Sequence, residues 1–246
     1  MSRLPELSLF FPCYNEADNL AAIVADAMAA LPLIAERFEI ILVDDCSRDA
    51  TPEVAARLVA AHPGVVRTVR HARNRGYGGA LRTGFTEARY GAVAFTDGDA
   101  QFRAADLARL LPLADPGTVV VGYRLHRADP FVRRLYARLY RLALVRCFGL
   151  RVRDVDCAMK LFPTQVLSGL RVRSDGAFFS AELLLALQAR GIRIAEVGVP
   201  HYPRTAGSPT GAKLSVILRA IRDFWWLRLA RWFAPTALAR AGRALR

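Results

Sequence analysis

The residues best suited to chemistry in this 246-residue chain are closely spaced acids. The sharpest group is Asp97-Gly98-Asp99, with Gln101 two residues further on. Two carboxylates separated by one small residue can direct oxygens at one divalent cation, and the glycine leaves room for a diphosphate. Hard oxygen ligands completed by substrate phosphates suit Mg²⁺ or Mn²⁺, which Asp97, Asp99 and Gln101 are predicted to hold. Alone, such a triplet is also typical of turns and helix caps.

Two further polar groups occur earlier, at residues 12–16 (Pro-Cys-Tyr-Asn-Glu) and 44–49 (Asp-Asp-Cys-Ser-Arg-Asp). Each follows a short apolar segment, as the Asp97 group does. Ligands of an open parallel sheet bind at the carboxyl ends of its strands, so we expect the three groups to meet along one edge. Acids gathered there would repel one another unless a cation or hydrogen-bond donors compensated their charge. The alternative for Asp44 and Asp49 is a local role in turns and helix caps.

The elements that must position these groups alternate between strand and helix. Strands are expected at residues 7–11, 38–43, 65–69, 92–96, 118–121, 159–162 and 192–199. Helices are expected at 16–31, from 51 onward, after a Gly-rich turn at 76–79 up to residue 90, after the fourth strand up to about 113, at 131–148, at 181–190 and at 213–233. Short, continuously apolar strands between helices predict a doubly wound, mostly parallel α/β sheet. Thr51 and Ser180 are expected to be helix N-caps, and Gly191 a helix end.

The net charge of +13 is concentrated in two segments. Residues 124–153 carry nine arginines against one acid, and residues 213–246 carry eight basic residues against one acid. Both segments also place leucines and aromatic residues at helical spacing, which predicts basic amphipathic helices. Such helices suit the headgroup layer of an anionic membrane, whereas the alternative is that their aromatic side chains pack on the core. No nucleic-acid-binding motif accompanies the charge, so nucleic acid is not an expected partner.

Composition narrows the class of protein further. A chain that is 53% hydrophobic and 23% charged can bury a core, which excludes a mainly disordered protein. We see neither an apolar leader nor an uninterrupted run long enough to cross a bilayer, and therefore expect a cytoplasmic protein, attached peripherally to the cytoplasmic face of a membrane. Four cysteines, spaced for neither a metal site nor a disulfide framework, are expected to be free thiols: Cys13, Cys46, Cys147 and Cys157.

In combination, the motifs at the expected strand ends resemble the family-2 inverting glycosyltransferases, whose fold is called GT-A. The matching pieces are Pro12-x-Tyr14-Asn15-Glu16, Val43-Asp44-Asp45-x-Ser47, Asn74-Arg75-Gly76 and Asp97-x-Asp99. The resemblance implies a catalytic GT-A domain over residues 1–212, followed by a basic helical segment over 213–246. It assigns the base and ribose of a nucleotide sugar to Pro12, Tyr14, Glu16, Val43 and Asp45. It assigns the metal-bound diphosphate to Asp97, Gly98, Asp99 and Gln101.

The second half is similar to the dolichyl- and undecaprenyl-phosphate sugar transferases of that family. The similarity covers residues 121–124, 154–162, 179–182 and 199–204. It implies a polyprenyl phosphate acceptor whose charge Arg124, Arg204 and Lys213, and also Arg134, would gather. It counts Arg124, Arg204 and Lys213 among the residues that bind the nucleotide sugar as well. The interval from Arg204 to Lys213 is longer than the family pattern, a departure that bears on the role of Lys213.

Together these likenesses imply the transfer of a hexose, mannose or glucose, from a GDP- or UDP-sugar to a polyprenyl phosphate. The implied catalytic set is Asp99, Arg124, Arg204 and Glu182. A phosphate acceptor is anionic at neutral pH and needs no general base. A hydroxyl acceptor on a lipid or glycan would need one, for which Asp156 and Glu182 are candidates. The residues are also compatible with a nucleotidyltransferase, or with a non-catalytic module that binds a nucleotide sugar or a membrane.

Overall fold

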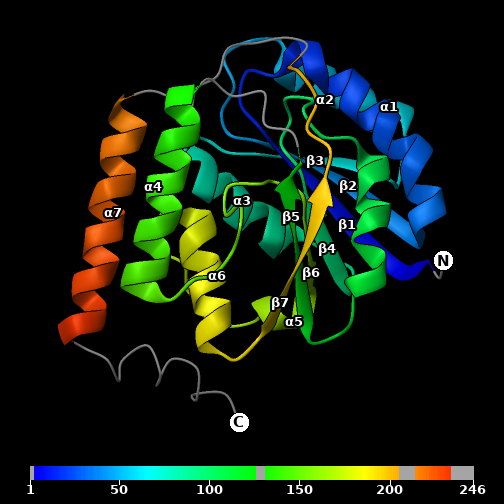
Figure 1. The fold of residues 1–246 in the computed structure, drawn as a ribbon. Helices are drawn as coiled ribbons and strands as arrows, with labels where there is room; N and C mark the ends of the chain where they lie inside the picture. Colours follow the sequence, from blue (N-terminus) through cyan, green and yellow to red (C-terminus); the bar gives the residue numbers. More distant parts are fainter. Residues whose placement is uncertain (1–2, 126–130, 205–213, 234–246) are drawn as a thin grey trace.

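The centre of the molecule is a seven-stranded sheet in the order β3-β2-β1-β4-β6-β5-β7 (Figure 1). The computed structural model describes residues 3–125, 131–204 and 214–233. The strands are β1 (Leu4–Cys13), β2 (Ala35–Asp44), β3 (Val66–Arg70), β4 (Ala92–Phe95), β5 (Thr118–Arg124), β6 (Lys160–Pro163) and β7 (Arg193–Val199). Neighbouring strands are parallel except where β6 pairs with β4 and β5. The predicted doubly wound, mostly parallel sheet is therefore confirmed.

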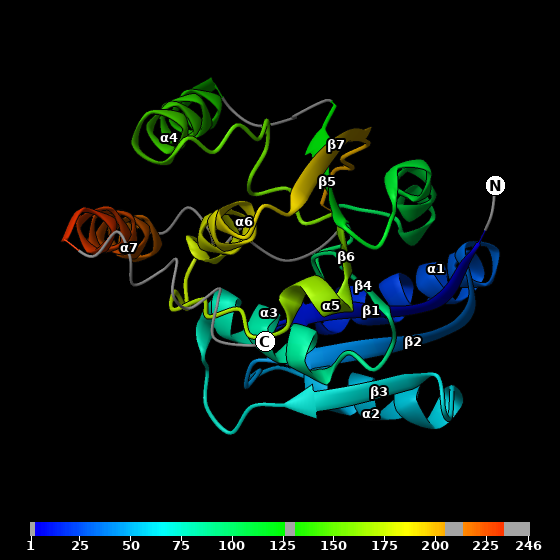
Figure 2. The ribbon, with the colours of Figure 1, turned by 90° about the horizontal axis from the view of Figure 1, so that it is seen from below.

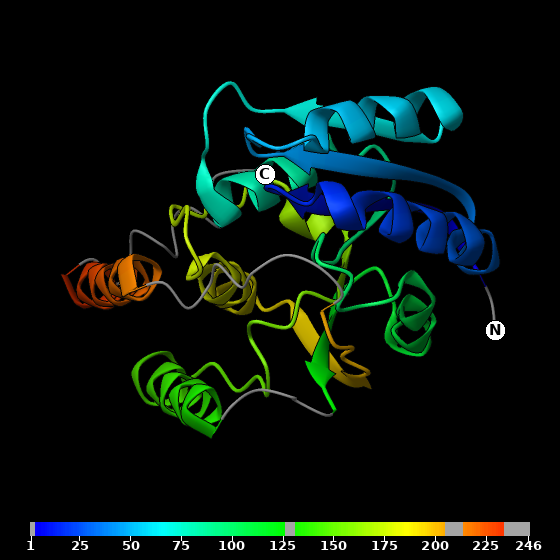
Figure 3. The ribbon, with the colours of Figure 1, turned by 90° about the horizontal axis from the view of Figure 1, so that it is seen from above.

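Helices cover both faces of the sheet, as the views from below and above show (Figure 2 and Figure 3). One face carries α1 (Ala17–Ile34), α2 (Thr51–Ala61) and the 3₁₀ helices η1 (Ala104–Arg109) and η2 (Leu111–Leu113). The other carries α3 (Gly76–Glu87), α5 (Thr164–Leu167) and α6 (Phe179–Ala189). Beyond α6 lie α4 (Phe131–Phe148) and α7 (Leu214–Phe233), side by side at one end of the molecule.

The glycines of α3 let this helix lie directly on the sheet. A Cβ at Gly84 would collide with the ring of Phe10 on β1. The next residue, Phe85, packs edge-on against Phe10, Phe95 and Phe162, with ring centroids 5.1, 5.7 and 5.1 Å apart. This close packing brings the first turn of α3 to the carboxyl edge of the central strands.

Two predicted helix caps are wrong. Ala50, not Thr51, is the N-cap of α2, and the Thr51 hydroxyl instead accepts the backbone N–H of Glu16 at 2.9 Å. Thr51 therefore joins the start of α2 to the loop that precedes α1. Ser180 lies inside α6, whose N-cap is Phe178. The Thr51 side chain is thus placed by a tertiary contact, and Ser180 is buried within the helix.

Two predictions about helix extent have opposite outcomes. Gly191 follows the end of α6 with φ +74°, as a terminating glycine should. The helix expected up to residue 113 is instead the pair η1 and η2. Pro112 lies at the start of η2, where its missing N–H cannot continue an α-helical ladder from η1.

The described parts of α4 and α7 contact the body through few residues. Phe224 of α7 is buried, with its ring centroid 5.0 Å from that of Phe148 and 6.0 Å from that of Phe178. We call the outward-facing apolar side chains of the two helices the α4–α7 surface: Leu135, Tyr136, Leu139, Leu142, Ile217, Leu218, Ile221, Trp225, Trp226 and Leu229. Exposed arginines lie among them, at 138, 141, 219 and 222. Phe224 therefore packs on the core, as the alternative for these aromatic residues expects. Trp225, in contrast, is 55% exposed, as a residue that contacts a membrane would be.

Among the described helices, only α1 is long and apolar enough to cross a membrane by length and composition. It lies near the N-terminus and buries eight side chains, including Leu20, Val24 and Leu31, in the core. Core helices of soluble proteins pass the same test, so α1 is weak evidence for a membrane span. All four cysteines are free thiols, as predicted.

Candidate active site

The loops that follow β1, β2 and β4 meet at one edge of the sheet, as expected from the parallel pairing. Asn15 joins the first two loops: its N–H donates to the Ser47 hydroxyl at 3.0 Å, and its Oδ1 accepts the Arg48 N–H at 2.8 Å. One non-glycine residue in each loop has positive φ, namely Asn15, Cys46 and Ala100 at 57°, 63° and 60°. Such backbone costs energy and clusters at functional sites.

Asp44 and Asp49 have the local roles that turn chemistry predicts. Asp44 accepts the N–H of Ser47 at 2.8 Å. Asp49 accepts the N–H of Thr51 at 3.0 Å and that of Ala17 at 3.2 Å. These two carboxylates therefore shape the loops rather than face a ligand.

Arg204, in the segment after β7, brings Asp99 and Glu16 together. Its guanidinium donates to Asp99 Oδ2 at 2.6 Å and lies 3.8 Å from Glu16 Oε1. Burial raises the pKa of Glu16, and the negative charges of Asp99 and Asp49 raise it further. The structure therefore unites three predicted site residues from segments more than eighty residues apart in the chain.

Asp97 is the other carboxylate of the Asp97-Gly98-Asp99 triplet. Burial and the negative charge of Asp99 raise its pKa to about 7. Its Oδ1 accepts the hydroxyl of Tyr77, which lies in the first turn of α3, at 3.0 Å. Tyr77 is not among the predicted site residues, because nothing in a Gly-rich turn indicates that its tyrosine reaches a residue twenty positions away.

Gly98 and Gln101 connect this loop to two others. A Cβ on Gly98 would lie 3.1 Å from the carbonyl oxygen of Pro12 and 3.4 Å from Cys13 Sγ, so the small residue lets the β1 and β4 loops touch. Gln101 is paired with Tyr202: the Gln101 Nε2 donates to the Tyr202 carbonyl at 3.2 Å, and the Tyr202 N–H donates to the Gln101 carbonyl at 2.9 Å. The segment carrying Arg204 is thereby anchored beside the triplet.

The predicted base-binding residues differ in accessibility. Tyr14 is 37% exposed and Pro12 is partly exposed, so both can contact a ligand. Val43 is wholly buried in β2 and cannot offer its side chain. Asp45 is also buried, and its carboxylate accepts hydrogen bonds from His71 Nδ1, Arg75 N and Gly76 N at 2.6, 2.7 and 2.8 Å.

Two other predicted residues have partners outside the triplet. Arg124 forms a bidentate ion pair with Asp154, at 2.6 and 2.8 Å, with both side chains largely buried. Glu182 accepts the backbone N–H groups of Arg173 and Ser174, each at 2.9 Å, and so holds that loop. Lys213 and the side chain of Arg134 lie outside the described residues.

A buried lysine that is not among the predicted site residues lies beneath the site. Lys160 begins β6, and its ammonium group donates to the carbonyls of Val155, at 3.0 Å, and Cys157. It therefore fixes the turn that carries Asp156, an exposed carboxylate whose negative charge reaches Tyr77. The position of Lys160 beneath the site follows from the strand order, which places β6 between β4 and β5, and not from a local sequence pattern.

The described residues fit a divalent ion that is completed by a ligand. They contain no group of three or more His, Cys, Asp or Glu side chains placed to hold a metal. The candidate ligands are the carboxylates of Asp97 and Asp99 and the side-chain amide of Gln101. Repulsion between the two acids contributes to the raised pKa of Asp97. Mg²⁺ and Mn²⁺ are commonly held by one or two carboxylates together with substrate phosphates and water.

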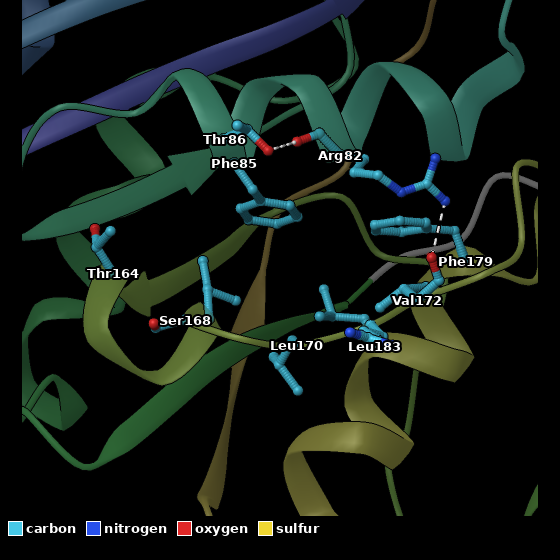
Figure 4. Close-up of a pocket in the computed structure, with 11 residues that line it drawn as sticks. Arg82, Phe85, Thr86, Thr164, Ser168, Leu170, Val172, Phe179 and Leu183 are labelled. Atoms are coloured by element: carbon cyan, nitrogen blue, oxygen red, sulfur yellow. Dashed lines mark hydrogen bonds between the residues drawn. The ribbon is translucent and has the colours of Figure 1, made fainter. Parts of the chain in front are cut away.

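A cavity of about 490 Å³ lies elsewhere, between α3, α5 and α6 (Figure 4). Its walls are mainly apolar, with the rings of Phe85 and Phe179 facing it. The guanidinium of Arg82 at its rim is occupied by Asp175 and by the carbonyls of residues 172 and 174. None of the predicted site residues lines this cavity.

Comparison with known proteins gives three results. The model of the family described as "Glycosyl transferase family 2" matches residues 8–171. An undecaprenyl-phosphate 4-deoxy-4-formamido-L-arabinose transferase of Edwardsiella ictaluri is 31% identical over 204 residues, which are 82% of this chain and 61% of the relative. A dodecaprenyl-phosphate galacturonate synthase of Rhizobium johnstonii is 28% identical over 82% of this chain and 60% of its own length. The chain thus spans about three fifths of the length of these curated relatives.

Solved structures resemble the fold. The crystal structure of glucosyl-3-phosphoglycerate synthase from Mycobacterium tuberculosis in complex with phosphoglyceric acid superposes with a TM-score of 0.69 at 19% identity, over 90% of this chain and 79% of that one. A complex of that enzyme with Mn²⁺, uridine diphosphate and phosphoglyceric acid gives 0.69 at 18% identity, over 91% and 78%. At these identities the likeness shows the fold alone.

Proposed function

This chain belongs to glycosyl transferase family 2 and has the GT-A fold, and we propose that it transfers a sugar from a nucleotide sugar to a polyprenyl phosphate. The observation that carries the proposal is the meeting of Asp97, Asp99 and Arg204 beside the loops of β1 and β2. Two relatives named for undecaprenyl and dodecaprenyl phosphate support the acceptor class. Those names specify a formamido-arabinose and galacturonate, so they do not support the narrower expectation of mannose or glucose. We retain a GDP- or UDP-sugar as the proposed donor.

In the proposed reaction, an oxygen of the acceptor phosphate attacks the anomeric carbon of the donor sugar. The bond from that carbon to the diphosphate breaks with inversion, and the nucleoside diphosphate leaves with the electron pair. The acceptor oxygen is already anionic, so no protein base has to remove a proton. Arg204 provides a guanidinium suited to the phosphates of two anionic substrates. Asp97, Asp99 and Gln101 would hold a divalent ion, which when bound would supply Lewis-acid stabilisation of the leaving diphosphate.

A hydroxyl acceptor is the second candidate, because Asp156 is an exposed carboxylate near the site edge. Glu182 is less suited to act as the base, since both of its oxygens already accept backbone N–H groups. Loss of transfer in Asp156→Asn, with donor binding retained, would favour this candidate over the phosphate acceptor.

The proposed function is tested by incubating the purified chain with undecaprenyl phosphate, Mn²⁺ and a panel of radiolabelled GDP- and UDP-sugars, including UDP-galacturonate. We expect one donor to give an organic-soluble product together with free nucleoside diphosphate. Release of pyrophosphate instead would indicate a nucleotidyltransferase. A complete panel without organic-soluble label, from a protein that binds nucleotide, would reject the polyprenyl phosphate acceptor.

The α4–α7 surface supports a second part of the proposal, namely peripheral attachment to an anionic membrane. Leu139 and Trp225 are 53% and 55% exposed, and arginines surround them. Apolar side chains that enter the headgroup layer and basic ones that meet anionic lipid act together in such binding. A polyprenyl phosphate acceptor lies in a membrane, so this surface would bring the site to its substrate.

Replacing both Leu139 and Trp225 by Ser is therefore expected to weaken binding to phosphatidylglycerol-containing vesicles by about tenfold or more, since each loses apolar area that lipid would cover. Co-sedimentation with vesicles measures the effect. Leu33→Ser is the matched control, because Leu33 is 78% exposed on α1, away from this surface. Equal losses in both proteins, or equal binding to uncharged phosphatidylcholine vesicles, would contradict the assignment.

A further inference from the structure

The turn between β3 and α3 contacts both ends of the site. Asp45, at the end of β2, accepts the N–H groups of Arg75 and Gly76 at 2.7 and 2.8 Å, and its carbonyl accepts Asn74 Nδ2 at 3.0 Å. Gly76 has φ +77°, and a Cβ there would lie 2.6 Å from the carbonyl oxygen of Asp175. The backbone before Tyr77 is thus held from the β2 side and leaves little room for displacement.

His71 strengthens this connection. Its Nδ1 lies 2.6 Å from Asp45 Oδ1, and its Nε2 lies 2.8 Å from the hydroxyl of Thr83 in α3. The Thr83 oxygen also accepts the Arg75 guanidinium at 3.4 Å. His71 therefore ties Asp45 to the second turn of α3 as well as to the first.

Tyr77 extends the connection to the other end of the site. It belongs to the first turn of α3, and its hydroxyl donates to Asp97 Oδ1 at 3.0 Å. The hydrogen bond fixes Oδ1 of Asp97, and the carboxylate has a second oxygen that can be offered to a metal ion. Desolvation and the neighbouring Asp97 carboxylate raise the pKa of Tyr77 above its ordinary value although the residue is 36% exposed, and a phenol is in any case a donor at neutral pH.

We infer that Tyr77 is a positioning residue that holds Asp97 in the orientation needed to bind the divalent ion. Asp45 and His71 set the place of Tyr77 through the turn, so the β2 end of the site and its metal-holding end are coupled through α3. Asp45 was expected to contact a nucleotide base; here it has a structural role, because it holds the turn that carries Tyr77. The inference rests on the proposed function only in treating Asp97 as a metal ligand.

The test is Mn²⁺ binding to the full chain, measured by electron paramagnetic resonance without donor or acceptor. Tyr77→Phe keeps the ring and removes the hydroxyl, and we expect about tenfold weaker binding, as for other hydrogen-bond partners of metal ligands. Tyr90→Phe is the control, because Tyr90 lies just before β4, at the opposite edge of the sheet. His71→Gln should also weaken binding, and the double variant should lose less than the two single losses multiplied together, because His71 acts through Tyr77.

Unchanged Mn²⁺ affinity in a Tyr77→Phe protein that melts at the wild-type temperature would overturn the inference. If that variant melts lower, His71→Gln supplies the second test, and unchanged Mn²⁺ affinity there would equally overturn the coupling. The result is separable from the proposed function. A wild-type chain that binds Mn²⁺ but transfers no sugar rejects the function alone, whereas transfer with normal Mn²⁺ binding in Tyr77→Phe rejects the inference alone.

Discussion

Asp99→Asn is expected to lower the rate of sugar transfer by about 10²-fold or more, since it removes a charge that the reacting diphosphate site needs. The amide has nearly the same shape as the carboxylate but binds a divalent ion far less well. It also removes the charge that helps to raise the pKa of Asp97, so the repulsion between the two acids disappears. The fold should therefore stay intact although the activity is lost. Initial rates at saturating donor, together with a thermal melt, measure both effects.

Glu36→Gln is the control for this substitution. Glu36 is an exposed acid at the start of β2, at the opposite end of the strands from the site. Its replacement changes the net charge equally and should leave the transfer rate within about twofold of the wild type, as is usual for surface substitutions. An Asp99→Asn protein that retains wild-type transfer would remove Asp99 from the site and with it the proposed reaction.

Arg204→Gln is expected to change two quantities in opposite directions. Transfer should fall by about 10²-fold, the loss typical of a donor that stabilises developing charge. Binding of Mn²⁺ alone should become stronger by roughly severalfold, because the guanidinium lies 2.6 Å from Asp99 Oδ2 and opposes a second cation there. We therefore expect Arg204 to compete with the metal when nucleotide is absent and to assist the phosphates when the donor is bound.

Arg57→Gln serves as the control, because Arg57 is exposed on α2 and has no contact with the triplet. Mn²⁺ titrations without nucleotide and transfer assays with donor separate the two effects. Parallel losses of metal binding and transfer in Arg204→Gln would mean that Arg204 supports the acids structurally. That result would contradict the proposed competition.

Much of the fold could be predicted because its signals are local. The apolar strands and the helices between them follow from short sequence patterns, and the range of α4 is the predicted one. Helix caps are less predictable, because Thr51 could cap a helix but is placed by a tertiary contact, and Ser180 is buried inside α6. The 3₁₀ helices after β4 likewise depend on packing against α1, which a leucine-rich segment does not reveal.

The candidate site was predictable only in part. Asp97 and Asp99 are singled out because two acids around a glycine fit a metal and a diphosphate, whereas Arg204 is singled out only by the resemblance to the polyprenyl-phosphate sugar transferases. Partners were harder to identify: a free arginine and an arginine locked to Asp154 look the same in a sequence, as Arg124 demonstrates. Tyr77 reaches Asp97 only because a glycine-rich helix packs tightly on β1.

The most direct measurement is an anomalous difference map at the manganese absorption edge, from crystals grown with Mn²⁺ and a nucleoside diphosphate. We predict a single strong peak that contacts the carboxylate oxygens of Asp97 or Asp99 and the diphosphate, with Tyr77 still bonded to Asp97. A diphosphate bound at this edge without manganese, or manganese bound away from both acids, would contradict the account.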